Sequence, residues 1–241
     1  MISINADKIR DLIETAFSGP EREEALLFHV SVERKAKALI LFYELVEKSL
    51  PNFVKINSQS TSSLDRKEAE EIIDIKPLLS EISAYIDAFF MSGRSTMDAF
   101  AHEIRSIYGL GGHTGNLYFS KVPSLLRRFH DNSRMSSYFQ SNDVENQAWY
   151  KELNIYRHAS THESIIPFMP SISIDPLTSE WKKPILKLPI DPTSRPLQYN
   201  SKNFVDIGKS IREGLSKLLV GIYDEILQDI VESKTKITST T

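Results

Sequence analysis

A continuous helical pattern over residues 76–108 constrains the fold of this chain more than any other feature. Its charged side chains Asp87, Arg94, Asp98 and Arg105 share one face. The apolar side chains share the opposite face, at the three- and four-residue spacing of an amphipathic α-helix. They are Ile82, Ile86, Phe89, Phe90, Met97, Phe100, Ala101, Ile104, Ile107 and Tyr108. At 1.5 Å per residue this helix is about 50 Å long.

Other segments repeat the same periodicity and predict a chain built mainly from helices. The long ones are residues 21–49, 144–163 and 201–231, and the short ones lie near 5–16 and 121–130. We expect the first long helix to end at Leu50-Pro51, because a proline pushes the preceding residue out of the α conformation. The Ser-, Asn- and Gln-rich residues 52–68 then predict a loop, and the tail after about residue 232 is expected to fray.

Residues 165–200 differ in character from the helical segments. Seven of the eleven prolines lie between Pro167 and Pro196, around short alternating runs such as "SISID" and "PILKLPI". Because prolines confine strands to sheet edges, we expect a small β-hairpin or Pro-rich flap here. The predicted fold class is therefore all-α, an up-and-down helical bundle with this flap, in a single helical domain over residues 1–241.

Composition excludes several classes of function. The chain has no cysteine, which rules out disulfides, thiolate metal sites and cysteine nucleophiles. Its net charge of −3 gives no overall attraction to nucleic acid. The first residues carry no apolar run of the signal-peptide type, and no uninterrupted apolar run approaches the ~18 residues of a membrane span. We therefore expect a cytoplasmic protein with no membrane partner and no cofactor.

Two stretches invite a phosphate-binding interpretation. The loop "GLGGHTG", residues 109–115, follows a helix and lacks the Lys-Ser/Thr pair of a P-loop, which favours a helix cap and turn. Residues 121–134 carry four basic side chains, and phosphate contacts need such a cluster. A solvated helix face explains it as well. Of these side chains, Arg127 and Arg128 are the weak candidates for RNA contact.

The stretch "YRHASTHES", residues 156–164, holds the densest set of chemically active side chains. His158 and His162 lie four residues apart, so one helix face can present both to a metal. However, the zincin motif needs a glutamate directly after the first histidine, and Ala159 occupies that position. A third ligand would have to come from elsewhere, with Glu163, His102 and Glu103 as the available side chains. We predict no metal.

Arg157 and His162 form a pair suited to phosphate chemistry. Arginine binds phosphate oxygens with a fixed charge, and histidine transfers protons near neutral pH. Together they could cleave a phosphodiester through the ribose 2′-hydroxyl without a metal. On a regular helix, however, five residues separate the two side chains by about 140°. They converge only if the helix loosens near Ser160-Thr161 or if a second subunit completes the site.

These residues resemble the motif of the HEPN superfamily, in which an arginine is commonly followed by a polar residue and then, after four to six positions, by a histidine. Arg157, His158 and His162 match it. The segment "STMDAFAHEIRSIYG" also resembles the long helix of bacterial HEPN-like proteins, in which an acidic residue often faces the motif, and Glu103 is the candidate. The resemblance covers about residues 76–163. It implies a core of about 76–231, closed by the last long helix, with the N-terminal helices of 5–49 packing on it.

The resemblance implies an all-α bundle, a homodimer with paired motifs at the interface, and metal-independent endoribonuclease activity of a toxin–antitoxin or defence type. Arg157 would stabilise phosphoryl charge and His162 would act as general base or acid, with His158 and Glu103 orienting or polarising them. RNA, a nucleotide and an antitoxin-like protein are the implied partners. Alternatively, the chain is a non-catalytic HEPN-like module for nucleotide binding, protein binding or dimerisation. Purely structural roles are also open, such as an ion pair between Arg157 and a carboxylate.

Overall fold

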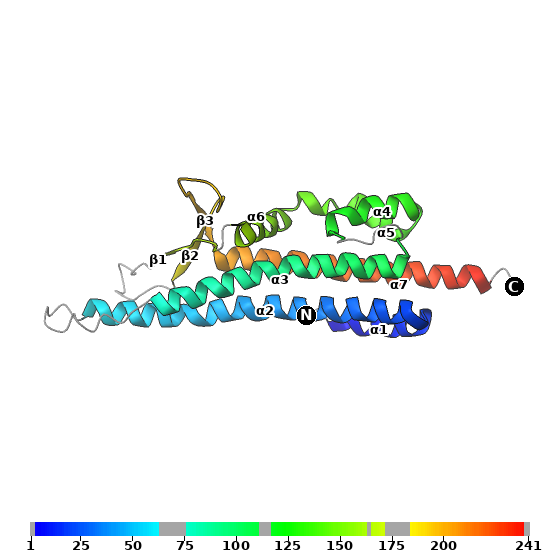
Figure 1. Cartoon of the computed structure of the whole chain (residues 1–241), viewed down its shortest axis with the longest axis horizontal. Helices are drawn as coiled ribbons and strands as arrows, with labels where there is room; N and C mark the ends of the chain where they lie inside the picture. Colours follow the sequence, from blue (N-terminus) through cyan, green and yellow to red (C-terminus); the bar gives the residue numbers. More distant parts are fainter. Residues whose placement is uncertain (1–2, 63–75, 111–116, 163–164, 172–183, 239–241) are drawn as a thin grey trace, which may run out of the picture. The chain divides into compact units, whose positions relative to one another are not determined.

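The computed structural model describes residues 3–62, 76–110, 117–162, 165–171 and 184–238. Helices dominate the described part of the chain, and three short strands form a small antiparallel sheet (Figure 1). The helices are α1 (Ser3–Ala16), α2 (Gly19–Ser62), α3 (Lys76–Tyr108), α4 (Val122–Phe129), α5 (Arg134–Ser141), α6 (Ala148–His162) and α7 (Phe204–Thr238). The strands are β1 (Met169–Ser171), β2 (Ile185–Pro189) and β3 (Tyr199–Asn203), and single 3₁₀ turns span Phe119–Lys121 and Val144–Asn146. The prediction of a mainly helical chain with a small β excursion is confirmed.

The described helices fall into two compact units. Unit 1 comprises residues 1–37, 92–151 and 211–241, and unit 2 comprises residues 38–91 and 152–210. The boundaries lie inside α2, α3, α6 and α7, so each of these helices contributes to both units. The single-domain expectation stays a prediction.

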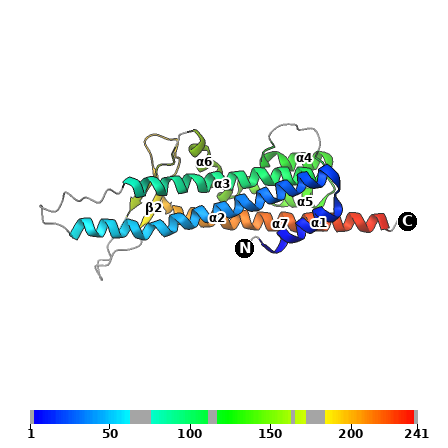
Figure 2. The same ribbon diagram turned by 60° about the horizontal axis from the view of Figure 1, so that its bottom comes forward.

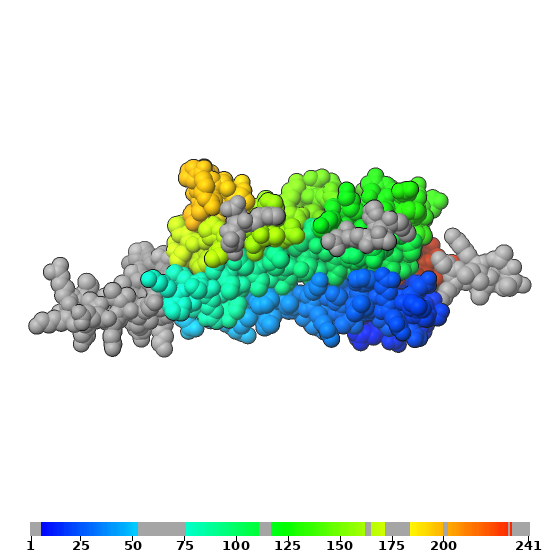
Figure 3. Space-filling view, viewed as in Figure 1, coloured from blue at the N-terminus to red at the C-terminus, as the bar shows by residue number. Residues whose placement is uncertain are grey.

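Unit 1 is a helical assembly whose core draws on every one of its helices. Fully buried side chains include Ile13 of α1, Phe100 of α3, Leu126 of α4 and Ile222 of α7. Helix α1 runs along the first part of α2 in both ribbon views (Figures 1 and 2), where Arg10 pairs with Glu33 of α2. The green α4–α5 segment forms much of this unit's surface in Figure 3.

The end of α3 shows why the glycine-rich loop begins where it does. Gly109 adopts a left-handed conformation with φ of +58°, which glycine tolerates without steric cost. The N–H of Leu110 then donates to the carbonyl of Arg105 at 3.1 Å, the 6→1 bond of a Schellman cap. Leu110 is buried beneath the turn. The predicted helix cap at Gly109 is confirmed, whereas residues 111–116 with His113 lie outside the described residues.

Unit 2 is built around aromatic side chains and the three-stranded sheet. Phe204, the first residue of α7, contacts Tyr43 of α2 and Phe89 of α3, with ring centroids 6.0 and 5.3 Å apart. Strand β2 lies between β1 and β3 and pairs antiparallel with both. Its inward side chains Leu186 and Leu188 are buried. The Pro-rich segment therefore forms a sheet, with a third strand that sequence analysis did not anticipate.

Helix α2 corrects one boundary. The chain stays helical through Pro51 to Ser62, so the predicted end at Leu50 was wrong, and residues 52–62 of the predicted loop are helical. The remaining residues 63–68 of that loop lie outside the described residues. An internal proline costs a helix about 3 kcal/mol through the lost N–H donor and a steric clash. Val46 and Leu50 are both fully buried on this helix, and tertiary packing of this kind overrides local preference.

Three further differences concern the two ends of α7 and the presence of α5. Residues 201–203 belong to β3, and α7 begins at Phe204, where the Asn203 side chain accepts a bond from the Asp206 N–H at 3.0 Å and so acts as N-cap. The same helix continues to Thr238 through the tail that was expected to fray. Helix α5 was not predicted, and Ser133 caps it by accepting from the Ser136 N–H at 3.0 Å.

Among the helices of the described residues, none carries a stretch apolar enough to cross a membrane.

Candidate functional site

Helix α6 carries the Arg-His motif, and its buried face fixes the direction of each motif residue. Leu153, Tyr156 and Ala159 are buried. The Tyr156 hydroxyl donates to the carbonyl of Pro189 in β2 at 2.7 Å, and its ring lies 4.8 Å from the ring of Phe90 of α3. Because Tyr156 anchors the helix on both α3 and the sheet, the next residue, Arg157, lies on the flank of α6, and His158 lies on its exposed side.

The side chain of Arg157 is half-buried, and its guanidinium is uncommitted in the sense that no described residue forms an ion pair with it. Its Nε atom is shielded from solvent and has no hydrogen-bond partner, and no ion pair joins this side chain to a described residue. Other arginines of the described chain are engaged: Arg94 pairs with Asp98 at 3.2 Å, and Arg134 pairs with Glu225 at 3.0 Å. The backbone carbonyl of Arg157 accepts a bond from the Thr161 hydroxyl at 2.9 Å, inside regular helix.

Helix α6 does not loosen before its last residue, His162. The local unwinding near Ser160-Thr161 that would let Arg157 and His162 converge is therefore not present. On this continuous helix the two positions point about 140° apart. The side chain of His162 and the residue Glu163 lie outside the described part of the chain. A metal site that uses either of them therefore stays an open alternative. Among described residues, no cluster of three or more His, Asp or Glu could hold a metal ion.

A carboxylate from α3 fixes the C-terminal end of α6. Asp87 accepts a bond from the N–H of Ile166 at 3.2 Å and another from the Ser160 side chain. Burial raises the pKa of the Asp87 carboxyl, although both of these bonds act to lower it. Sequence analysis placed Asp87 on a charged face but did not predict this contact, which spans 79 positions along the chain.

Glu103 occupies a different environment from the one expected of a motif partner. It belongs to unit 1, whereas Arg157 belongs to unit 2. Its side chain is completely buried, and its two carboxyl oxygens lie 2.7 Å from His29 Nδ1 and 2.9 Å from the Tyr223 hydroxyl. Both oxygens therefore already have partners inside the core of unit 1.

The basic stretch of residues 121–134 does not form one patch of available charge. Arg127 and Arg128 are exposed on α4, and the Arg128 guanidinium lies 5.2 Å from the centre of the Phe129 ring. Arg127 borders a surface hollow of about 170 Å³ that acidic side chains also line, among them Asp143. Arg134 is engaged by two glutamates, Glu225 and Glu232 of α7. The solvated-face interpretation fits these surroundings.

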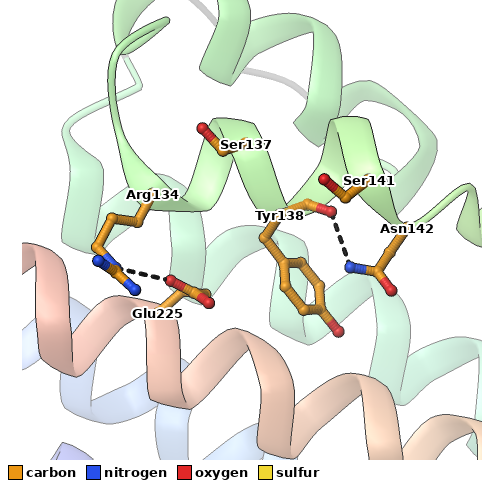
Figure 4. A pocket seen from close by; sticks show the side chains of 6 residues that line it. All are labelled: Arg134, Ser137, Tyr138, Ser141, Asn142 and Glu225. Atoms are coloured by element: carbon orange, nitrogen blue, oxygen red, sulfur yellow. Dashed lines mark hydrogen bonds and ion pairs between the residues drawn. The ribbon is translucent and has the colours of Figure 1, made fainter.

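An open groove of about 430 Å³ between α5 and α7 was not predicted. Figure 4 shows Arg134 reaching Glu225 there, with the ring of Tyr138 pointing toward α7. Asp229 of α7 accepts bonds from the Arg134 N–H at 2.9 Å and from the Tyr108 hydroxyl at 2.7 Å, so it caps α5 from outside the helix. The acidic residues at positions 225, 229 and 232 share one helical face, which is the sequence signal for this contact.

Comparison with known proteins adds no relative: no family model, curated protein or solved structure matches this chain.

Proposed function

We propose that α6 of unit 2 binds a phosphate-bearing ligand of the nucleotide or RNA class through Arg157. The uncommitted guanidinium carries this proposal. A buried donor without a partner costs about 1–3 kcal/mol, and the Nε of Arg157 is such a donor. Two phosphate oxygens would satisfy the guanidinium in the fork geometry that arginine offers and lysine does not.

The surroundings of Arg157 support an anion more than a cation. His158 follows it on the exposed side of α6, and among the described residues the carboxylate of Asp87, at the end of this helix, already accepts two hydrogen bonds. The HEPN resemblance implies the nucleotide or RNA class of ligand. In this proposal one chain acts as a binding module, and Glu103 takes no part because both its oxygens are engaged elsewhere.

Endoribonuclease activity is the second candidate, and the same uncommitted guanidinium favours it, because stabilising a phosphoryl group needs a free charge. On the continuous α6 the backbone positions of Arg157 and His162 face about 140° apart around the helix axis. Cleavage of the HEPN type therefore requires a homodimer in which the motif of one copy meets that of the other.

The binding proposal is tested with a fluorescently labelled single-stranded RNA of about 20 nucleotides, titrated in EDTA and followed by anisotropy. Arg157→Ala should weaken binding by roughly 10–100-fold, the range expected for a lost charge-assisted hydrogen bond of about 1.5–3 kcal/mol. The slope of log K against log salt should become shallower by about 0.7 for each lost phosphate contact. Arg157→Lys should recover only part of the affinity, because lysine lacks the fork.

Arg34→Ala is the matched control, since Arg34 is an exposed arginine on α2 of unit 1 and its loss should leave affinity unchanged. Equal affinity of wild type and Arg157→Ala would overturn the binding proposal. Loss of full-length RNA in EDTA, abolished in both Arg157→Ala and His162→Ala and accompanied by a dimer on size-exclusion chromatography, would instead establish the endoribonuclease.

A further inference from the structure

His29, Glu103 and Tyr223 form a buried polar network in the core of unit 1. Each comes from a different long helix, α2, α3 and α7 respectively. Glu103 Oε1 lies 2.7 Å from His29 Nδ1, and the Tyr223 hydroxyl donates to Glu103 Oε2 at 2.9 Å. All three side chains are at most 2% exposed. Through its polar contacts the network therefore joins the helices α2, α3 and α7 within the core of unit 1.

An aromatic ring packs against this network. The ring of Phe100 lies edge-on to Tyr223 with the centroids 5.2 Å apart. His29 Nε2 is shielded from solvent and has no hydrogen-bond partner. Among the described residues, His29 and Tyr223 are the hydrogen-bond partners of Glu103. An ionised carboxylate in such surroundings is costly, because burial removes its hydration.

The electrostatics act in the same direction. Burial raises the pKa of the Glu103 carboxyl, although the contacts with His29 and Tyr223 act to lower it. Burial and the neighbouring Glu103 raise the pKa of the Tyr223 hydroxyl well above its ordinary value. The other ionisable side chain that acts on both is Glu33 of α2, whose negative charge raises both pKa values and which pairs with Arg10 of α1.

We propose that His29, Glu103 and Tyr223 form a proton-dependent lock between α2, α3 and α7 of unit 1. In the closed state, Glu103 keeps its proton and donates it through Oε1 to His29 Nδ1, while the Tyr223 hydroxyl donates to Oε2. When the carboxyl ionises, its proton passes to solvent, and a buried negative charge remains. Unit 1 then loosens at the junction of the three helices. The lock is a pH-sensitive device and is independent of ligand binding by α6.

The sign of the pH dependence follows from linkage. A carboxyl whose pKa is higher in the folded than in the unfolded state contributes stability at low pH, and that contribution is lost as the pH rises. The window begins at the ordinary glutamate pKa of 4.5 and extends upward to the raised value in the folded protein. Within it, the folding equilibrium constant falls by up to about tenfold per pH unit for one proton.

Glu103→Gln is the decisive variant, because glutamine resembles the protonated carboxyl and cannot ionise. Urea unfolding of wild type and Glu103→Gln, measured from pH 4 to 9, should give matching stability at pH 4. Wild type should then lose stability relative to the variant as the pH rises. Glu24→Gln serves as the control, since Glu24 is an exposed α2 glutamate paired with Arg105, and it should show no such trend.

The opposite trend, with wild type gaining on Glu103→Gln above pH 4.5, would identify an imidazolium–carboxylate ion pair and overturn the lock. A second measurement does not depend on the variant folding. Imidazole ¹⁵N shifts of His29 in the wild-type protein should report Nδ1 as a hydrogen-bond acceptor while the lock is closed, and Nδ1 as a donor to Glu103 would likewise overturn the proposal.

Discussion

Replacing Phe204 by alanine is expected to lower the free energy of unfolding by about 3–5 kcal/mol, the usual cost of removing a fully buried phenylalanine. Phe204 has no exposed surface, and its ring lies against those of Tyr43, Phe89 and Phe90. Alanine would leave a cavity at the start of α7 and would remove two edge-to-face contacts. The rings around it come from two different helices, α2 and α3, so they cannot close the gap by a single shift.

Equilibrium urea unfolding followed by circular dichroism measures this loss. Phe129→Ala is the matched control, because Phe129 is 44% exposed on α4 and its removal leaves no cavity. We expect the control to change stability by less than about 1 kcal/mol. A Phe204→Ala protein as stable as the control would show that this aromatic cluster does not hold unit 2 together.

Gly214→Ala should destabilise the protein, although alanine in a helix is ordinarily favoured over glycine by about 1 kcal/mol. A Cβ atom built on Gly214 would lie 2.3 Å from Cγ of Trp149 and 2.4 Å from its neighbouring ring atoms. These atoms lie at the end of the indole that is bonded to Cβ. The side chain is only 6% exposed, so the indole cannot move away without a shift of the start of α6. The expected loss is about 1–3 kcal/mol or more, as for other overpacked cores.

Two comparisons separate overpacking from a general helix effect. Combining Gly214→Ala with Trp149→Leu should cost less than the sum of the single changes, which a double-mutant cycle measures. A Cβ atom on Gly221 would meet the far end of the half-buried Tyr138 side chain, namely its hydroxyl oxygen and, at 2.9 Å, two adjacent ring atoms. Gly221→Ala should therefore be the milder change. If Gly214→Ala raised stability by the helix-propensity amount, the close approach of Trp149 to α7 would be refuted.

The local elements of this fold were largely predictable because their determinants lie within a few residues. The apolar stripe of residues 76–108 predicted α3, whose side chains from Ile82 to Ile104 on that stripe are buried. Gly109 ended it where a left-handed residue was needed. By contrast, α2 runs through Pro51. Side chains packed against other parts of the chain outweighed the local cost of the proline, and no local rule includes them.

The candidate site was predictable only in part, for the same reason. The sequence context of Arg157 and the resemblance to the HEPN motif singled it out, and helical spacing predicted that it points away from His162. That its Nε is buried and unpaired depends on what packs around α6, and sequence spacing does not contain that information. Glu103, the acid expected to assist Arg157, could not be placed from the sequence. A polar residue at the edge of an apolar stripe can face solvent, a ligand or the core.

By itself, the sequence determined most of the long helical segments and their apolar faces, because helical periodicity is set by neighbours three and four residues apart. Only the tertiary structure decided that Glu103 faces inward, since its partners His29 and Tyr223 lie 74 and 120 positions away in the chain. The carboxyl that the family resemblance offered to catalysis is thereby held in the core of unit 1, whereas Arg157 on α6 has a shielded Nε without a hydrogen-bond partner. Contacts between residues far apart in the sequence separate these two roles.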